Sequence, residues 1–90
     1  MKIKRKHGRT QAEAKERLIA LANTMGMNLE WVDAYSAVGS LKYNSVVVSG
    51  AAQVTDTEVI LDVELPRLAR MFASRIEKQV QQQMDEALMS

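Results

Sequence analysis

The residues that could carry chemistry are few and lie far apart along the chain. It holds one histidine, His7, and no cysteine, which excludes a thiolate nucleophile, an iron–sulfur cluster and a histidine-rich metal site. Asp62 and Glu64 share one face of a predicted strand, where they could seat a divalent cation or form an acid–base pair, but exposed strands carry such pairs routinely. No G-x-S-x-G motif is present, and the four glycines are too scattered for a phosphate-binding loop. The pattern predicts a protein that is not an enzyme and needs neither a cofactor nor a metal.

Positive charge is concentrated at the start of the chain. Residues 1–17 carry seven Lys or Arg and two Glu, a net charge of +5, whereas the rest carries five basic and nine acidic side chains, a net charge of −4. The candidate basic patch consists of Lys2, Lys4, Lys6 and Arg9, which could meet an acidic polymer. We favour the other interpretation, a basic edge strand beside an acidic strand of the same sheet, because edge lysines also hinder aggregation.

Length and composition are those of one small globular domain. The 90 residues form a single domain, 1–90, and folding at this size hides roughly 60–65% of the unfolded surface. Hydrophobic residues make up 47% and charged residues 26%, the balance of a globular rather than a disordered protein. No apolar run approaches the ~18 residues that a membrane-spanning helix needs. We expect a cytoplasmic protein.

The elements that must position these residues begin with a strand and a capped helix. Residues 1–7 alternate around Ile3, as in a short strand at or near a sheet edge. Thr10 and Glu13 have the spacing of a capping box, and Gly26 stands where a helix ends on a left-handed residue. A helix is therefore predicted from about residue 10 to 25.

The middle of the chain predicts strands. Residues 27–31 alternate, 33–40 are small and polar and predict a loop, and the parity of 41–54 changes at Asn44-Ser45, which predicts a tight connection there. Residues 58–65 form the clearest strand, and its acidic outer face suits the basic first strand as a neighbour.

Pro66 is suited to the first turn of a closing helix of roughly 22 residues, about 33 Å long. The fold class is α+β. We expect a small antiparallel sheet of four to five strands with two helices on one face, in the order β-α-β-β-β(-β)-α.

An apolar stripe runs along this closing helix. Its first half places four side chains within about 80° of one another: Leu65, Leu68, Phe72 and Ile76. Three more follow at steps of four residues: Val80, Met84 and Leu88. Each step drifts by 40°, so either a twisted sheet follows the drift, or these three bind a second subunit, a partner helix or an apolar surface.

The chain resembles the small polyhydroxyalkanoic acid system proteins, which are found in bacteria near genes for polyester storage granules. The resemblance covers essentially the whole chain and rests on these features: Met1-Lys2-Ile3 with His7, the capped helix, Leu29-Glu30-Trp31, Leu41-x-Tyr43, Val48-x-Gly50-x-Ala52-x-Val54-Thr55-Asp56, Val59-x-Leu61-x-Val63-x-Leu65 and the closing helix. The stretch between Trp31 and Leu41 is longer than usual, which leaves the role of the 33–40 loop open. The family implies a granule-associated or granule-regulating role and supplies no catalytic residues.

The leading hypothesis is a non-enzymatic accessory protein of the polyhydroxyalkanoate system, located in the cytoplasm at storage granules. It acts by binding a granule surface or a partner protein through its amphipathic C-terminal helix, or by forming a homodimer through Val80, Met84 and Leu88. The alternative is an RNA- or ribosome-associated module that uses the basic N-terminal strand, although nucleic-acid stacking aromatics are missing.

A third class of function is a small-molecule-binding module. The candidate site is the space between helices and sheet around Trp31 and Tyr43. With so few aromatic residues and so thin a core, we expect side chains to fill that space.

Overall fold

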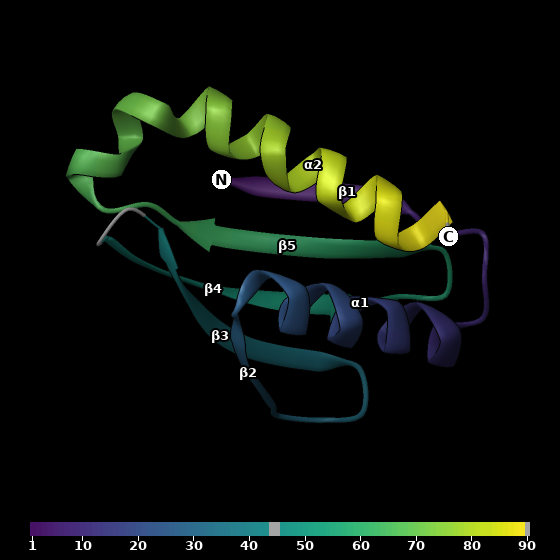
Figure 1. Ribbon diagram of the computed structural model, residues 1–90. Helices are drawn as coiled ribbons and strands as arrows, with labels where there is room; N and C mark the ends of the chain where they lie inside the picture. The colour runs from purple at the N-terminus through teal and green to yellow at the C-terminus, as the bar shows by residue number, and fades with distance from the viewer. Residues whose placement is uncertain (44–45, 90) are drawn as a thin grey trace.

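Five strands form one antiparallel sheet, and two helices lie together on one of its faces (Figure 1). This computed structural model describes residues 1–43 and 46–89, without the side chains at positions 43, 46, 68 and 69. The elements in chain order are β1 (Lys2–Lys6), α1 (Gln11–Met25), β2 (Asn28–Trp31), β3 (Ser36–Tyr43), β4 (Val46–Val54), β5 (Glu58–Glu64), the 3₁₀ helix η1 (Arg67–Phe72) and α2 (Ala73–Met89). The α+β class and the element order agree with the prediction.

The strand order is β1-β5-β4-β3-β2, so the basic first strand is an edge strand beside the acidic fifth. In the antiparallel register, Lys2 lies opposite Asp62 and Lys6 lies opposite Glu58. Opposite charges across neighbouring strands stabilise the pairing modestly. The interpretation of the basic segment as an edge strand next to an acidic one is confirmed.

The caps of α1 form as the sequence predicts. The Thr10 hydroxyl oxygen accepts a hydrogen bond from the Glu13 amide at 3.2 Å, and Gly26 ends the helix at φ +73°. Along α1, Lys15 places its ammonium 4.4 Å from the centre of the Trp31 ring, which ties the helix to β2.

The core lies between the helices and the inner face of the sheet. Its buried members come from both helices and three strands: Ile3, Ala14, Leu18, Leu21, Ala52, Val54, Val59, Leu61, Met84 and Leu88. Because strand side chains alternate, the outer face holds the residues between these positions, which are charged or small and polar apart from apolar side chains such as Val38, Val47 and Ile60. Both helices therefore pack on the same face, as expected from the parity of β5.

The predicted loop at 33–40 is wrong for most of its length. β3 begins at Ser36 and pairs with β2 on one side and β4 on the other. Only a tight turn separates β2 from β3, closed by the Tyr35 amide donating to the Asp33 carboxylate at 2.9 Å. Small residues in this segment indicated a loop, yet one of them, Gly39, stands where β3 approaches β2 too closely for a Cβ atom. The predicted connection at Asn44-Ser45 lies outside the described residues.

The closing helix is not uniform. Residues Arg67–Phe72 form a 3₁₀ helix, and the α-helix begins only at Ala73. A 3₁₀ helix has three residues per turn instead of 3.6, which changes the direction of the side chains before Ala73. Phe72 is therefore 49% exposed instead of buried, while Ile76 still meets the core.

Of the two alternatives for Val80, Met84 and Leu88, the structure shows the first, in which the fold follows the drift of the stripe. Met84 is 1% exposed and Leu88 7% exposed, and Val80 packs against the same core. The stripe is covered because α2 packs against α1 and against β1 at the edge of the sheet. As a binding surface, Met84 and Leu88 would first have to leave the core of their own chain.

Candidate functional site

An apolar cleft opens between α1 and α2 above the inner face of the sheet. The helices meet where α1 begins and α2 ends, and they diverge toward the left of the view in Figure 1. The cleft lies on the diverging side, between Met25 near the end of α1 and Ile76 near the start of α2. The space between helices and sheet, which we expected side chains to fill, is thus partly open.

Two glycines form the floor of the cleft. Gly39 of β3 and Gly50 of β4 are register partners, and both line the cleft. Their neighbours of the same parity on β3 and β4, Ala37 and Ala52, are buried on the inner face. Because glycine has no side chain, the sheet presents bare backbone at both positions. The Leu29 side chain of β2 partly covers Gly39, since its Cδ2 would lie 2.8 Å from a Cβ there, and the rest of the space above the pair stays open.

The walls of the cleft are apolar. They come from α1, β3, β4 and α2: Leu21, Met25, Leu41, Val48, Ile76 and Val80. The cavity volume is about 100 Å³. Trp31 does not line it, and the Tyr43 side chain lies outside the described residues, so the cleft is displaced from the site around Trp31 that the sequence suggested.

The opposite end of the molecule is closed by polar contacts. The Arg9 guanidinium donates to the Leu88 carbonyl at the end of α2, with 2.9 Å between the nitrogen and oxygen. The Gln11 side-chain amide donates to the Val54 carbonyl at 2.8 Å. The Arg9 contact holds the end of α2 beside the residues that precede α1, and the Gln11 contact holds the start of α1 against β4, so this end of the cleft is closed.

His7 has a structural role in this closed end. Its side chain is buried, Nε2 lies 2.9 Å from the Thr55 carbonyl oxygen, and Nδ1 accepts from the Arg9 amide at 3.0 Å. Both ring nitrogens are therefore engaged by backbone groups. Neither is free for a substrate or a metal ion.

Three of the four basic-patch residues share one exposed face of β1, and Arg9 lies apart from them. Lys2, Lys4 and Lys6 are exposed along β1, where they lie opposite Asp62, Ile60 and Glu58. Arg9 instead binds the end of α2 and approaches Glu13. The structure therefore sets two of the lysines beside carboxylates and directs Arg9 elsewhere.

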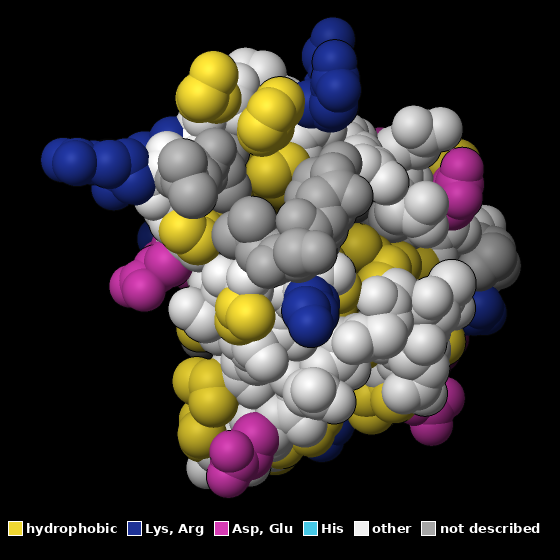
Figure 2. Space-filling model, turned by 60° about the vertical axis from the view of Figure 1, so that its left-hand side comes forward, with side chains coloured by type: hydrophobic (Ala, Val, Ile, Leu, Met, Phe, Trp, Pro, Cys, Tyr) yellow, Lys and Arg dark blue, Asp and Glu magenta, His cyan; other side chains and the backbone are white. Residues whose placement is uncertain are grey.

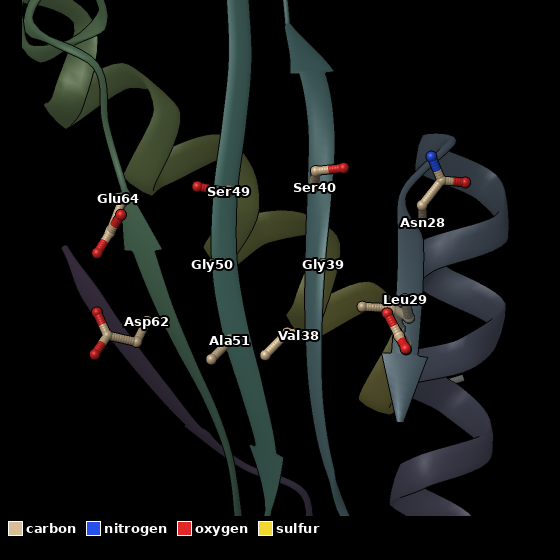
Figure 3. A pocket seen from close by; sticks show the side chains of 11 residues that line it. Asn28, Leu29, Val38, Gly39, Ser40, Ser49, Gly50, Ala51, Asp62 and Glu64 are labelled. Carbon is tan, nitrogen blue, oxygen red and sulfur yellow. The ribbon is translucent and has the colours of Figure 1, made fainter. Parts of the chain in front are cut away.

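The outer face of the sheet has a shallow hollow of about 540 Å³ above the same two glycines (Figure 3). Asp62 and Glu64 lie along β5 at its edge, with Ser49 and Ala51 on the neighbouring strand (Figure 3). Both carboxylates are exposed. Among residues 1–43 and 46–89, no group of three His, Cys, Asp or Glu could hold a metal ion. The hollow is a solvated face built from small residues.

A further feature that sequence reasoning missed is the tip formed by η1 and the first turn of α2. We call it the η1 tip and define it by five exposed residues: Arg67, Arg70, Met71, Phe72 and Arg75. Met71 is 83% exposed and Phe72 49%. Figure 2 turns this end of the molecule forward and shows hydrophobic side chains beside projecting Lys and Arg side chains. The sequence analysis assumed an α-helix from Pro66 onward, and that period placed Phe72 on the buried face.

Comparison with known proteins shows the family to which this chain belongs. A family model, "putative polyhydroxyalkanoic acid system protein", matches residues 1–88. The chain belongs to this family. No curated protein matches the chain. No helix in the described part of the polyhydroxyalkanoic acid system protein is long and apolar enough to span a membrane.

The sequence analysis also did not predict the floor of the cleft, which Gly39 and Gly50 form in this family member. The parity of β4 already placed Gly50 with Val48 and Ala52 on one face. A signal for Gly39 was present too, because it shares parity with Leu41. Because residues 33–40 were expected to form a loop, the pairing of Gly39 with Gly50 was not predicted. The strand register shows it.

Proposed function

We propose that this protein is a non-enzymatic accessory protein of the polyhydroxyalkanoate system that binds the surface of polyester granules through the η1 tip. The observation that carries the proposal is the exposure of Met71 and Phe72 on one short 3₁₀ helix. Contiguous exposed apolar surface marks interaction sites in soluble proteins, and these two side chains are adjacent in the chain. Adsorption would place the protein at cytoplasmic storage granules.

The chemistry of the tip suits a polyester. Such a polymer presents alkyl groups, which favour contact with Met71 and Phe72, and ester carbonyl oxygens, which accept hydrogen bonds. Arg67, Arg70 and Arg75 are exposed around the apolar pair, and each guanidinium carries five N–H donors. An apolar centre with a cationic rim is also the composition of segments that lie in an interface.

The polar groups in the described part of the chain support a binding role over catalysis. His7 is held by backbone groups through both ring nitrogens. The side chains of Asp62 and Glu64 are exposed on the outer face of the sheet, opposite the face that the helices cover. The five residues that define the η1 tip include no carboxylate and no histidine.

Sedimentation with purified polyester granules tests the proposal. The double variant Met71→Ser/Phe72→Ser should partition onto granules at least about tenfold less than the unmodified protein, because burying either side chain contributes about 1.5–3 kcal/mol. The matched control is Met89→Ser, since Met89 is equally exposed, at 83%, but lies at the end of α2. Its partition should be unchanged.

Two outcomes would contradict the proposal. One is equal partition of the double variant and the Met89→Ser control. The other is a homodimer in sedimentation velocity that the double variant dissociates, because the tip would then be a subunit interface. Binding that depends on Lys2, Lys4 and Lys6 and falls steeply with salt would instead support the nucleic-acid alternative.

A further inference from the structure

The cleft between α1 and α2 is open in a place where small proteins are normally packed. Interiors of folded proteins reach the density of organic crystals, with few voids larger than a water molecule. Here Gly39 and Gly50 remove the side chains that would occupy the space between the helices and the sheet. Neither glycine can be replaced simply, since a Cβ would lie 2.6 Å from the Asn28 carbonyl oxygen or 2.4 Å from that of Asp62. The open floor is therefore built into the sheet.

The lining of the cleft limits the chemistry of its occupant. Leu21, Val48 and Ile76 are buried around it, and Leu41 and Val80 are partly exposed toward it. Asp62 is the only charged residue along the lining in the described part of the chain, and its side chain is exposed on the outer face. A charged group inside would have no partner, which is strongly unfavourable. The occupant must be apolar where it enters.

The size of the cleft further limits which apolar molecules can bind there. Its volume of about 100 Å³ is smaller than the cavity of about 150 Å³ that admits benzene in an apolar protein core. A narrow unbranched chain of a few carbons fits such a space better than a ring does. Met25 and Met27 on the lining have flexible side chains that can adapt to the end of a chain.

We propose that the cleft binds the end of a short unbranched aliphatic acyl chain and leaves its carboxylate or ester at the mouth, beside Gln79. Hydroxyalkanoic acids, which give the family its name, are acyl chains of this kind. This binding needs no granule surface, so it is separate from adsorption through the η1 tip. The cleft takes the acyl chain of a free acid and of an ester alike, because the feature that it recognises is the alkyl tail.

Titration of the whole protein with butanoate, hexanoate, octanoate and decanoate tests the proposal, followed by nuclear magnetic resonance of its methyl groups. Affinity should rise about fourfold for each added methylene until the cleft is full. The methyl groups of Leu21, Leu41, Val48 and Val80 should shift, and those of Val32 and Val38 should not. Methyl octanoate should bind about as tightly as octanoate, because the tail is what the cleft recognises.

Two matched variants locate the site. Val80→Phe places a ring in the cleft and should weaken octanoate binding at least about tenfold, whereas Val38→Phe, at a position 45% exposed on the outer face, should leave it unchanged. Circular dichroism reports whether each variant folds. Should Val80→Phe fail to fold, the chain-length series and the methyl shifts of the unmodified protein decide the matter.

Several results would overturn the inference. They are an affinity that does not depend on chain length, binding of the acid without its ester, shifts confined to residues outside the cleft, or equal weakening by both variants. Adsorption to granules would be unaffected by any of them. Conversely, loss of adsorption in Met71→Ser/Phe72→Ser would leave binding of octanoate intact.

Discussion

Gly39 and Gly50 face each other across β3 and β4, and neither position has room for a Cβ atom. The nearest obstacle to a side chain at Gly50 is the backbone carbonyl of Asp62, which cannot move without disturbing β5. Gly39 therefore permits the close approach of β3 to β2, and Gly50 that of β4 to β5, while the pair together forms the floor of the cleft. Its requirement for glycine is steric, because neither residue has a positive φ.

Substitution of Gly50 tests this relationship. Gly50→Ala should lower the free energy of unfolding by about 1–3 kcal/mol, the usual cost of forcing an extra carbon into a packed site. Ser49→Ala, the next residue on the exposed outer face, is the control and should change it by less than about 0.5 kcal/mol. Urea denaturation measures both. Equal midpoints for the two variants would show that β4 and β5 can separate without cost.

Because a 3₁₀ helix precedes α2, we predict opposite effects on stability for Phe72 and Ile76, which lie four residues apart. Phe72→Ala should change the free energy of unfolding by less than about 0.5 kcal/mol, because the side chain is largely exposed. Ile76→Ala should lower it by about 2–5 kcal/mol, since Ile76 is 7% exposed. Thermal unfolding compares them. A large loss for Phe72→Ala would mean that the helical period continues unbroken from Pro66.

Substitution of two methionines of α2, Met84 and Met89, tests whether the apolar stripe is part of the core or binds a partner. Met84→Ala should lower the free energy of unfolding by about 2–5 kcal/mol, while Met89→Ala should leave it within about 0.5 kcal/mol, because Met84 is 1% and Met89 83% exposed. Denaturant unfolding at two protein concentrations measures the effect. A Met84→Ala protein that is folded and stable but has lost a dimer would contradict the burial of this side chain within one chain.

Several parts of the fold followed from local patterns in the sequence. Thr10, Glu13 and Gly26 determine both ends of α1 through groups that lie within one turn of each other. The alternation of β5 and the opposite charges of β1 and β5 predicted which strands are neighbours. Such features depend on short-range geometry and on the sign of charges, which the sequence displays directly.

The tertiary structure decided what the local patterns could not. Small residues at 36–40 are typical of a loop in isolation, and only pairing with β2 and β4 makes them a strand. The burial of Met84 depends on how α2 packs against α1 and the sheet. The exposure of Phe72 depends on where the 3₁₀ helix ends and the α-helix begins. The cleft exists because two glycines distant in sequence become register partners while the helices above them diverge. Each of these outcomes depends on the packing of several elements at once, so no single segment of the sequence contains it.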